Sequence, residues 1–142
     1  MAEIINQIPG YENGIVNYVS ATDEVAALFL AAQMASDLLN KWNANVAFFS
    51  FTNRCEGLLN LVKNESKVAR LHTVFQKNNH LYVLIRKARG LTNRQSVHKF
   101  IIEGLPQQNA VGKRWLEHLA QSSNASIVVI EVHDEVLESS LN

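Results

Sequence analysis

Apolar residues recur along the chain in two kinds of segment, short continuous runs and longer stretches with helical spacing. The short runs are rich in β-branched and aromatic side chains, which is typical of buried strands. We predict strands at residues 14–19, 45–52, 81–85, 99–105 and 126–132. The second of these, NVAFFSFT, does not alternate with polar residues, which favours a central parallel strand buried on both faces.

Helical spacing characterises most of the segments between these strands. Residues 20–42 predict the longest helix, which Ser20 or Thr22 can cap. Its inward face is predicted to consist of Val25, Leu28, Phe29, Ala32, Ala35, Leu39 and Trp42. Further helices are predicted at 54–64 and 110–122. The segment 65–78 fits either a helix or half of a hairpin with the following strand, and we favour the helix.

The predicted order is therefore β-α-β-α-β-β-α-β, which indicates one α/β domain over residues 1–142 with flexible ends at 1–10 and 135–142. Such alternation predicts a mostly parallel sheet with helices on both faces. The working groups of such sheets lie at the carboxyl ends of the strands. Here these are residues 20–24, 50–54, 86–94, 103–109 and 131–135.

Composition narrows the class of function. The 13 basic and 13 acidic residues give zero net charge, so nucleic-acid binding would need a local basic patch. A single cysteine and the absence of zinc-ligand spacing among the histidines argue against a metal site, and no cofactor is expected. The first residues do not form a signal peptide and no apolar window is long enough to span a membrane, so we expect a cytoplasmic protein.

Several segments, in the same order, resemble the RecA-like core of DnaB-type replicative helicases. GIVNYVSATDEVAALFLAAQ and then NVAFFSFT are similar to the strand, phosphate-loop helix and next strand of that core. HLYVLIRKARGLT resembles the family's LYI…GLT segment, and KFIIEGL lies where the family has its Walker B strand. VGKRWLEHLAQSSNASIVVIEV resembles the helix and strand that follow. The likeness covers about residues 8–134 and implies a RecA-like three-layer sandwich.

The residues that bind ATP in that family are missing here. A phosphate loop reads G-x-x-x-x-G-K-[ST], and its glycines and lysine hold the phosphates. The matching stretch is SATDEVAA, in which residues 25–27 fall at the G-K-T positions and Asp23 and Glu24 precede them. The Walker B-like strand ends in Glu103, a vestigial acid, where the family has aspartate. The resemblance thus implies a degenerate RecA-like domain without ATPase activity.

The segment RKARGLTNRQSVHK at 86–99 is rich in basic residues. It contains no acid, and its basic residues are Arg86, Lys87, Arg89, Arg94 and Lys99. After a strand at 81–85 these residues would form a loop at the carboxyl edge of the sheet, where they would bind an anion or an acidic partner. The alternative is a solvated loop that aids solubility. No aromatic residue lies between the basic ones, which gives little support to nucleic-acid recognition by stacking.

Three further residues carry weaker signals. Cys55 follows Asn53 and Arg54 at a predicted helix start, a location that lowers a thiol pKa, although one cysteine is more often a small buried residue. Trp42 and Trp115 belong to apolar helical stripes, and we expect both to pack in the core.

Two functions remain open from the sequence. The first is a non-catalytic interaction or regulatory protein that binds another protein, such as a replication or recombination ATPase, or assembles with its own copies. The resemblance suggests such a partner because RecA-like domains commonly assemble side by side. The second is a ligand- or nucleotide-binding domain or enzyme that uses a strand-end crevice around Glu103 and the basic segment 86–99.

Overall fold

The structure of the protein is a computed structural model that describes residues 10–77 and 80–133. Within these residues five parallel strands form one sheet in the order β1-β5-β4-β2-β3. The strands are β1 (Val16–Ala21), β2 (Val46–Ser50), β3 (Leu71–Phe75), β4 (Lys99–Glu103) and β5 (Ser126–Val132). The helices are α2 (Glu24–Asn40), α3 (Cys55–Val62), α4 (Leu81–Gln95) and α5 (Ala110–Ser122).

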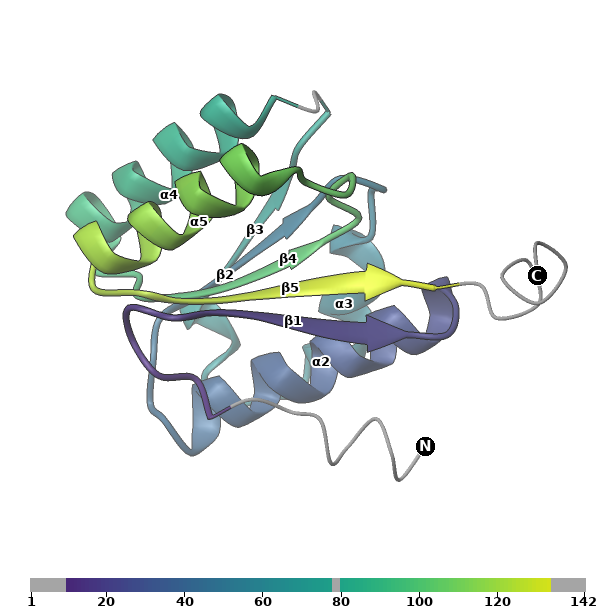
Figure 1. Ribbon diagram of the computed structural model, residues 1–142. Helices are drawn as coiled ribbons and strands as arrows, with labels where there is room; N and C mark the ends of the chain where they lie inside the picture. Colours follow the sequence, from purple (N-terminus) through teal and green to yellow (C-terminus); the bar gives the residue numbers. More distant parts are fainter. Residues whose placement is uncertain (1–9, 78–79, 134–142) are drawn as a thin grey trace, which may run out of the picture.

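The chain forms the three-layer α/β arrangement that the sequence predicts. Helices α2 and α3 cover one face of the sheet, and α4 and α5 cover the other (Figure 1). The predicted flexible ends, apart from Gly10, lie outside the described residues. No helix in the described part of the chain is long and apolar enough to cross a membrane.

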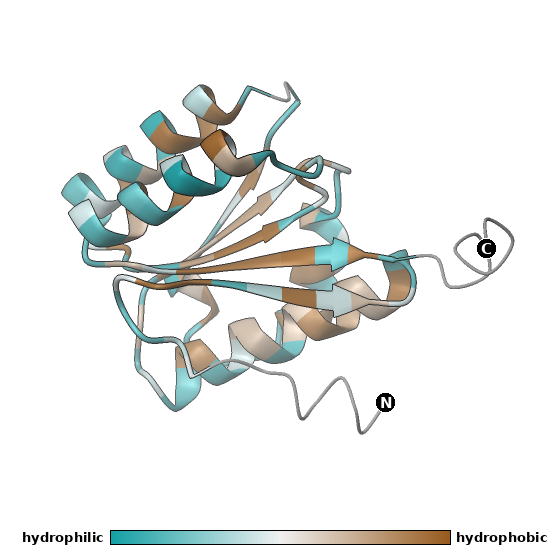
Figure 2. Ribbon diagram, viewed as in Figure 1, coloured by the Kyte–Doolittle hydropathy of each residue, from teal (hydrophilic) through white to brown (hydrophobic). Residues whose placement is uncertain are grey.

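The three central strands are buried on both faces, which confirms the prediction for the run 45–52. Every residue of β2 and β4 is buried, and Figure 2 shows the hydrophobic colours concentrated in the strands. Successive side chains of a strand point to opposite faces. Phe48 therefore packs in the core beneath α2 and α3, whereas Phe49 packs in the core beneath α4 and α5.

The predictions for residues 65–85 were wrong. The expected helix at 65–78 is a short 3-10 helix, Val68–Arg70, followed by strand β3, and the expected strand at 81–85 is the first part of α4. In α4 the buried residues Leu84, Ile85 and Ala88 recur with helical spacing. Their short apolar run alone cannot distinguish a strand from a buried helical turn.

Helix α2 is rotated relative to the predicted inward face. The side chains of Val25 and Phe29 are 64% and 53% exposed, although both were expected in the core. Of the predicted face, Ala35 and Leu39 are buried. The other buried residues of the helix are Ala27, Leu30, Ala31, Met34 and Leu38. Alanines on this face let the helix lie close to the sheet, and larger residues on either side fill the remaining space.

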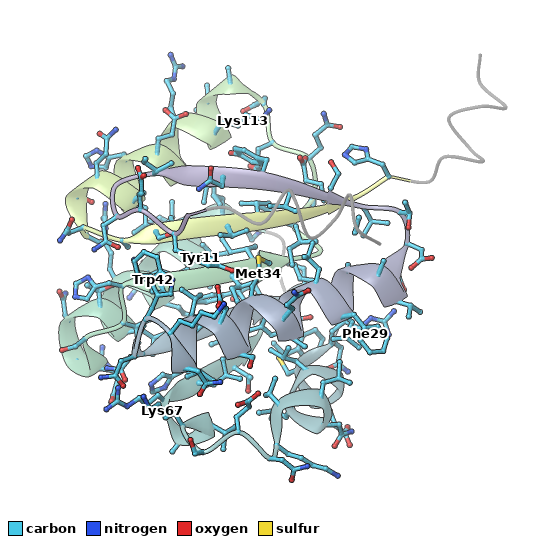
Figure 3. The ribbon with its side chains drawn as sticks, turned by 90° about the horizontal axis from the view of Figure 1, so that it is seen from below. Tyr11, Phe29, Met34, Trp42, Lys67 and Lys113 are labelled. Atoms are coloured by element: carbon cyan, nitrogen blue, oxygen red, sulfur yellow. The ribbon has the colours of Figure 1, made fainter. Side chains whose placement is uncertain are left out.

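The two tryptophans are half exposed, so the prediction that both pack in the core was wrong. Trp42 is 47% exposed and Trp115 is 48% exposed. Trp42 follows the end of α2, where its ring meets that of Tyr11 edge to face with centroids 5.8 Å apart (Figure 3). Trp115 lies on α5, whose buried face is formed by neighbouring residues such as Leu116 and Leu119.

Candidate functional site: the strand-end crevice

A crevice of about 290 Å³ opens at the carboxyl ends of β4 and β5. Strand β2 leads into α3 on one face of the sheet, whereas its neighbour β4 leads into α5 on the other face (Figure 1). This divergence leaves a gap at the strand ends, where open α/β sheets bind their ligands. The lining of the crevice includes Glu24, Ala27, Thr52, Glu103, Glu131 and His133.

The turn from β1 into α2 is where the sequence resemblance would put a phosphate loop, and a carboxylate caps the helix there. Asp23 is the N-cap of α2, and its side chain accepts a hydrogen bond from the Ala26 N–H at 2.7 Å. The first helical residue, Glu24, forms an ion pair with Arg54. The N–H groups that would attract a phosphate at a helix start therefore already face fixed negative charge.

Glu103 ends β4 inside the crevice, where the sequence predicts a vestigial Walker B-like acid. Its side chain is only 4% exposed. The Thr52 hydroxyl, just beyond β2, donates to the carboxylate at 2.8 Å, and the Ser50 hydroxyl lies 3.4 Å away. Burial raises the pKa of the Glu103 carboxyl, while the hydrogen bond from Thr52 and the charge of Arg54 oppose that rise.

The crevice is lined by acidic residues and would repel a nucleoside triphosphate. Glu24, Glu103 and Glu131 contribute carboxylates to its lining, and among the described residues no lysine or arginine lines it. Arg54 lies nearby but is paired with Glu24. Phosphates entering this space would meet like charges at short range in a partly desolvated site.

Replacing Glu103 with glutamine is expected to raise the melting temperature at pH 8 and to leave it nearly unchanged at pH 4. The folded pKa of Glu103 lies above its unfolded value because of burial, so ionisation destabilises the folded state as the pH rises through the folded pKa. Glutamine keeps an oxygen for the Thr52 hydroxyl and carries no charge. Thermal unfolding at the two pH values measures the difference.

The exposed Glu12→Gln substitution is the matched control, since it removes the same charge outside the crevice. It should change the melting temperature little at either pH. A Glu103→Gln protein less stable than the natural protein at pH 8 would contradict the assignment of Glu103 as a buried, destabilising carboxylate.

The predicted basic residues do not form a loop and do not reach this crevice. Arg86, Lys87, Arg89 and Arg94 all lie on helix α4, because the segment that contains them is helical. Arg86, Lys87 and Arg94 line a separate groove of about 610 Å³. This α4–β3 groove is lined by Val83, Arg86, Lys87, Leu91 and Arg94 of α4 and by Val74 of β3. Arg89 is exposed on the same helix but outside that lining.

Lys99 is buried, so the expectation that it belongs to an exposed basic loop was wrong. Lys99 is the first residue of β4, at the opposite end of that strand from Glu103. The ammonium group donates to the Tyr11 carbonyl oxygen at 2.6 Å and to Asn13 Oδ1 at 2.7 Å. It also lies 4.8 Å from the centre of the Trp42 ring, and burial lowers its pKa. Lys99 therefore holds the segment before β1 against the sheet.

Cys55 does not have the activated thiol that its position at a helix start suggested. It is the first residue of α3 and is half-buried. Burial raises the pKa of the thiol, and the nearby charge of Glu103 raises it further. The thiol is therefore less reactive than a solvated one.

Two features of the crevice were missed in the sequence. The role of Asp23 as N-cap could have been recognised, because aspartate is among the residues preferred immediately before the first turn of a helix. The contact of Thr52 with Glu103 had no such signal, because the two residues are 51 positions apart and meet only through the register of β2 and β4. Within the described residues no group of three or more histidine, cysteine or acidic side chains is placed to hold a metal ion.

A comparison with models of protein families gives no match, and a search of curated proteins gives no significantly similar sequence.

Proposed function

We propose that this chain is a degenerate RecA-like domain that does not hydrolyse nucleotides and acts by binding another protein. The resemblance to DnaB-type helicases motivates the RecA-like assignment, and a parallel sheet between two helical layers is compatible with it. The proposed partner is a RecA-like ATPase of replication or recombination, because RecA-like domains commonly pack side by side. Assembly with a second copy of the chain is the related possibility.

One observation carries the proposal: carboxylates lie at the turn between β1 and α2, where the resemblance would put a phosphate loop. Asp23 caps the helix that would receive the phosphates, and Glu24 and Glu103 lie in the adjoining crevice. A bound phosphate would have to displace the hydrogen bond from Ala26 to Asp23 and approach the remaining acids. Each lost charge-assisted contact costs roughly 1.5–3 kcal/mol, which removes the affinity that an ATPase needs.

Exposed aromatic side chains support protein binding as the alternative use of the fold. Phe29 of α2 and Trp115 of α5 are each about half exposed, on helices of opposite layers. Large aromatic residues at the surface often anchor protein interfaces, because they bury much apolar area with little loss of conformational entropy.

Thermal unfolding in the presence of ATP, ADP and Mg²⁺ tests the nucleotide part of the proposal. We expect no change in melting temperature at millimolar nucleotide. A ligand at 100 times its dissociation constant would add about 2.7 kcal/mol of stability, a shift of several degrees in a domain of this size. A shift that disappears in Glu103→Gln would instead support the second function, a ligand-binding domain that uses the crevice.

Addition of the chain to a purified replicative helicase or recombinase from the same organism tests the partner. We expect the partner's ATP hydrolysis to change while the chain alone hydrolyses none. Sedimentation of the chain alone distinguishes self-assembly from partner binding. A monomeric chain that leaves both ATPases unaffected and does not co-sediment with them would overturn the proposed partner class.

A further inference from the structure

Among the described residues, strand β3 forms one edge of the sheet, and its outer side pairs with no other strand of that part of the chain. On its inner side it pairs with β2. The Gln76 N–H donates to the Ser50 carbonyl oxygen at 2.8 Å, which places Gln76 on the β2 side. Main-chain groups alternate in direction along a strand, so those of Thr73 and Phe75 point to the open edge. Such an edge is a template for another strand.

The α4–β3 groove runs beside this edge and is positively charged. Arg86, Lys87 and Arg94 line it, and no acid of the described residues belongs to its lining. None of the three forms an ion pair within the described residues. Arg86 instead rests on the Tyr82 ring, 5.7 Å from the ring centre. The cations are therefore held beside the strand edge without a neutralising partner from this part of the chain.

We propose that the β3 edge and the α4–β3 groove together bind an extended acidic segment of a partner protein. The segment would add a strand beside β3 through the main-chain groups of Thr73 and Phe75. Every second side chain of that strand would point toward α4, the face on which Val74 contributes to the groove. Acidic residues at those alternate positions would meet Arg86, Lys87 and Arg94.

Main-chain pairing and charge have different roles in this recognition. Hydrogen bonds along the edge supply affinity for any extended chain, whereas the cations select acidic side chains at every second position. The apolar floor formed by Val74, Val83 and Leu91 provides contact for the aliphatic parts of glutamate side chains. The inference rests on the proposed function, since it identifies the kind of segment by which a protein partner would be held.

The probe is a synthetic nine-residue peptide with glutamate at alternate positions and threonine between them. Binding is followed by fluorescence anisotropy, and amide hydrogen exchange is followed residue by residue by NMR. We expect the Thr73 and Phe75 amides to exchange more slowly when the peptide is bound. The His72 and Val74 amides, which face β2, serve as the internal reference and should change little.

Two matched variants test the charges. Arg86→Glu/Arg94→Glu reverses two cations of the groove and is expected to weaken peptide binding at least about tenfold. Arg89→Glu/Arg114→Glu reverses two exposed cations outside the groove with the same change in net charge, and should weaken it by less than about threefold. Equal losses of affinity in the two variants would show that only net charge matters, and would overturn the groove as the binding site.

Two further peptides test the main chain. Methylation of alternate amide nitrogens on the edge-facing side of the peptide removes its hydrogen-bond donors and keeps its charge, and should abolish binding. Lysine in place of glutamate should do the same. Binding that survives methylation, or that leaves Thr73 and Phe75 unprotected, would overturn strand addition.

A single-stranded oligonucleotide is tested alongside the peptides, because phosphates are attracted to the same cations. Tighter binding of the oligonucleotide, lost in Arg86→Glu/Arg94→Glu, would overturn the acidic peptide as the occupant. The proposed function has a separate readout. A nucleotide-induced thermal shift would reject it, whereas an unprotected β3 edge without such a shift would reject only the groove.

Discussion

Replacing Phe49 with alanine is expected to lower the free energy of unfolding by about 3–5 kcal/mol. Phe49 lies on β2, an interior strand of the sheet, and has no exposed surface. Its ring packs 6.1 Å from that of Phe100 on the neighbouring strand β4, beneath α4 and α5. Alanine would leave a cavity that the surrounding strands cannot close, because the hydrogen bonds of β2 to both neighbours hold the backbone in place. Urea unfolding measures the loss.

Phe29→Ala is the control, with the same change in side chain on the outer surface of α2. Phe29 is 53% exposed and Figure 3 shows it at the surface of the helix, so the expected change is within about 0.5 kcal/mol. The sequence pattern assigned this residue to the inward face, which predicts a large loss. Comparable losses at Phe29 and Phe49 would restore that assignment and contradict the observed rotation of α2.

Replacing Gly104 with alanine is expected to destabilise the domain by about 2–4 kcal/mol, a fall in melting temperature on the order of 10 °C. Two effects add. Gly104 has a φ of +77°, in the region that favours glycine, and a β-carbon there would lie 2.6 Å from Thr52 Cγ2. The chain must turn sharply after Glu103 at this point, while Thr52 is held by its hydrogen bond to the Glu103 carboxylate. Thermal and urea unfolding measure the change.

Two comparisons separate strain from crowding at this turn. Gly14 has a φ of +87°, and a β-carbon at that position would have no atom within 4 Å, so Gly14→Ala should cost only the conformational part, about 1 kcal/mol. Thr52→Ser keeps the hydroxyl that binds Glu103 and removes the crowding methyl group. The double variant Gly104→Ala/Thr52→Ser should recover part of the loss. Equal costs at Gly14 and Gly104 would exclude the crowding.

The elements that the sequence predicts correctly are those whose local pattern and tertiary environment agree. Residues 46–49 are all apolar because β2 has a neighbouring strand on each side and a helical layer on each face. Glu103 was placed correctly because an acid that ends a buried strand must lie at the carboxyl edge of a parallel sheet. Asp23 and Glu24 were placed at the same edge of the sheet because they follow the predicted strand at 14–19.

The errors fall where two structures share one local pattern. The run 81–85 is short and apolar both in a strand and in a helix that covers a sheet, and it became helical because α4 must cover β2 and β4. Strand β3 is at the sheet edge and alternates weakly, so its residues carry little strand signal. The sequence predicted a helix before residue 80 and a strand after it, whereas the structure has a strand and then a helix. Arg86, Lys87 and Arg94 therefore lie in a groove beside the β3 edge and not in a loop at the crevice.

Residue order was sufficient to predict the α/β class and the parallel sheet, because alternating strands and helices favour parallel pairing. The missing phosphate-loop motif at residues 20–27 could be read directly from that one segment. Tertiary packing decided which face of α2 is buried, the burial of Lys99 beside the Trp42 ring and the hydrogen bond between Thr52 and Glu103. Each of these depends on strand register and on contacts between segments far apart in the chain. Local periodicity carries no information about such contacts, so they arise only when the layers pack together.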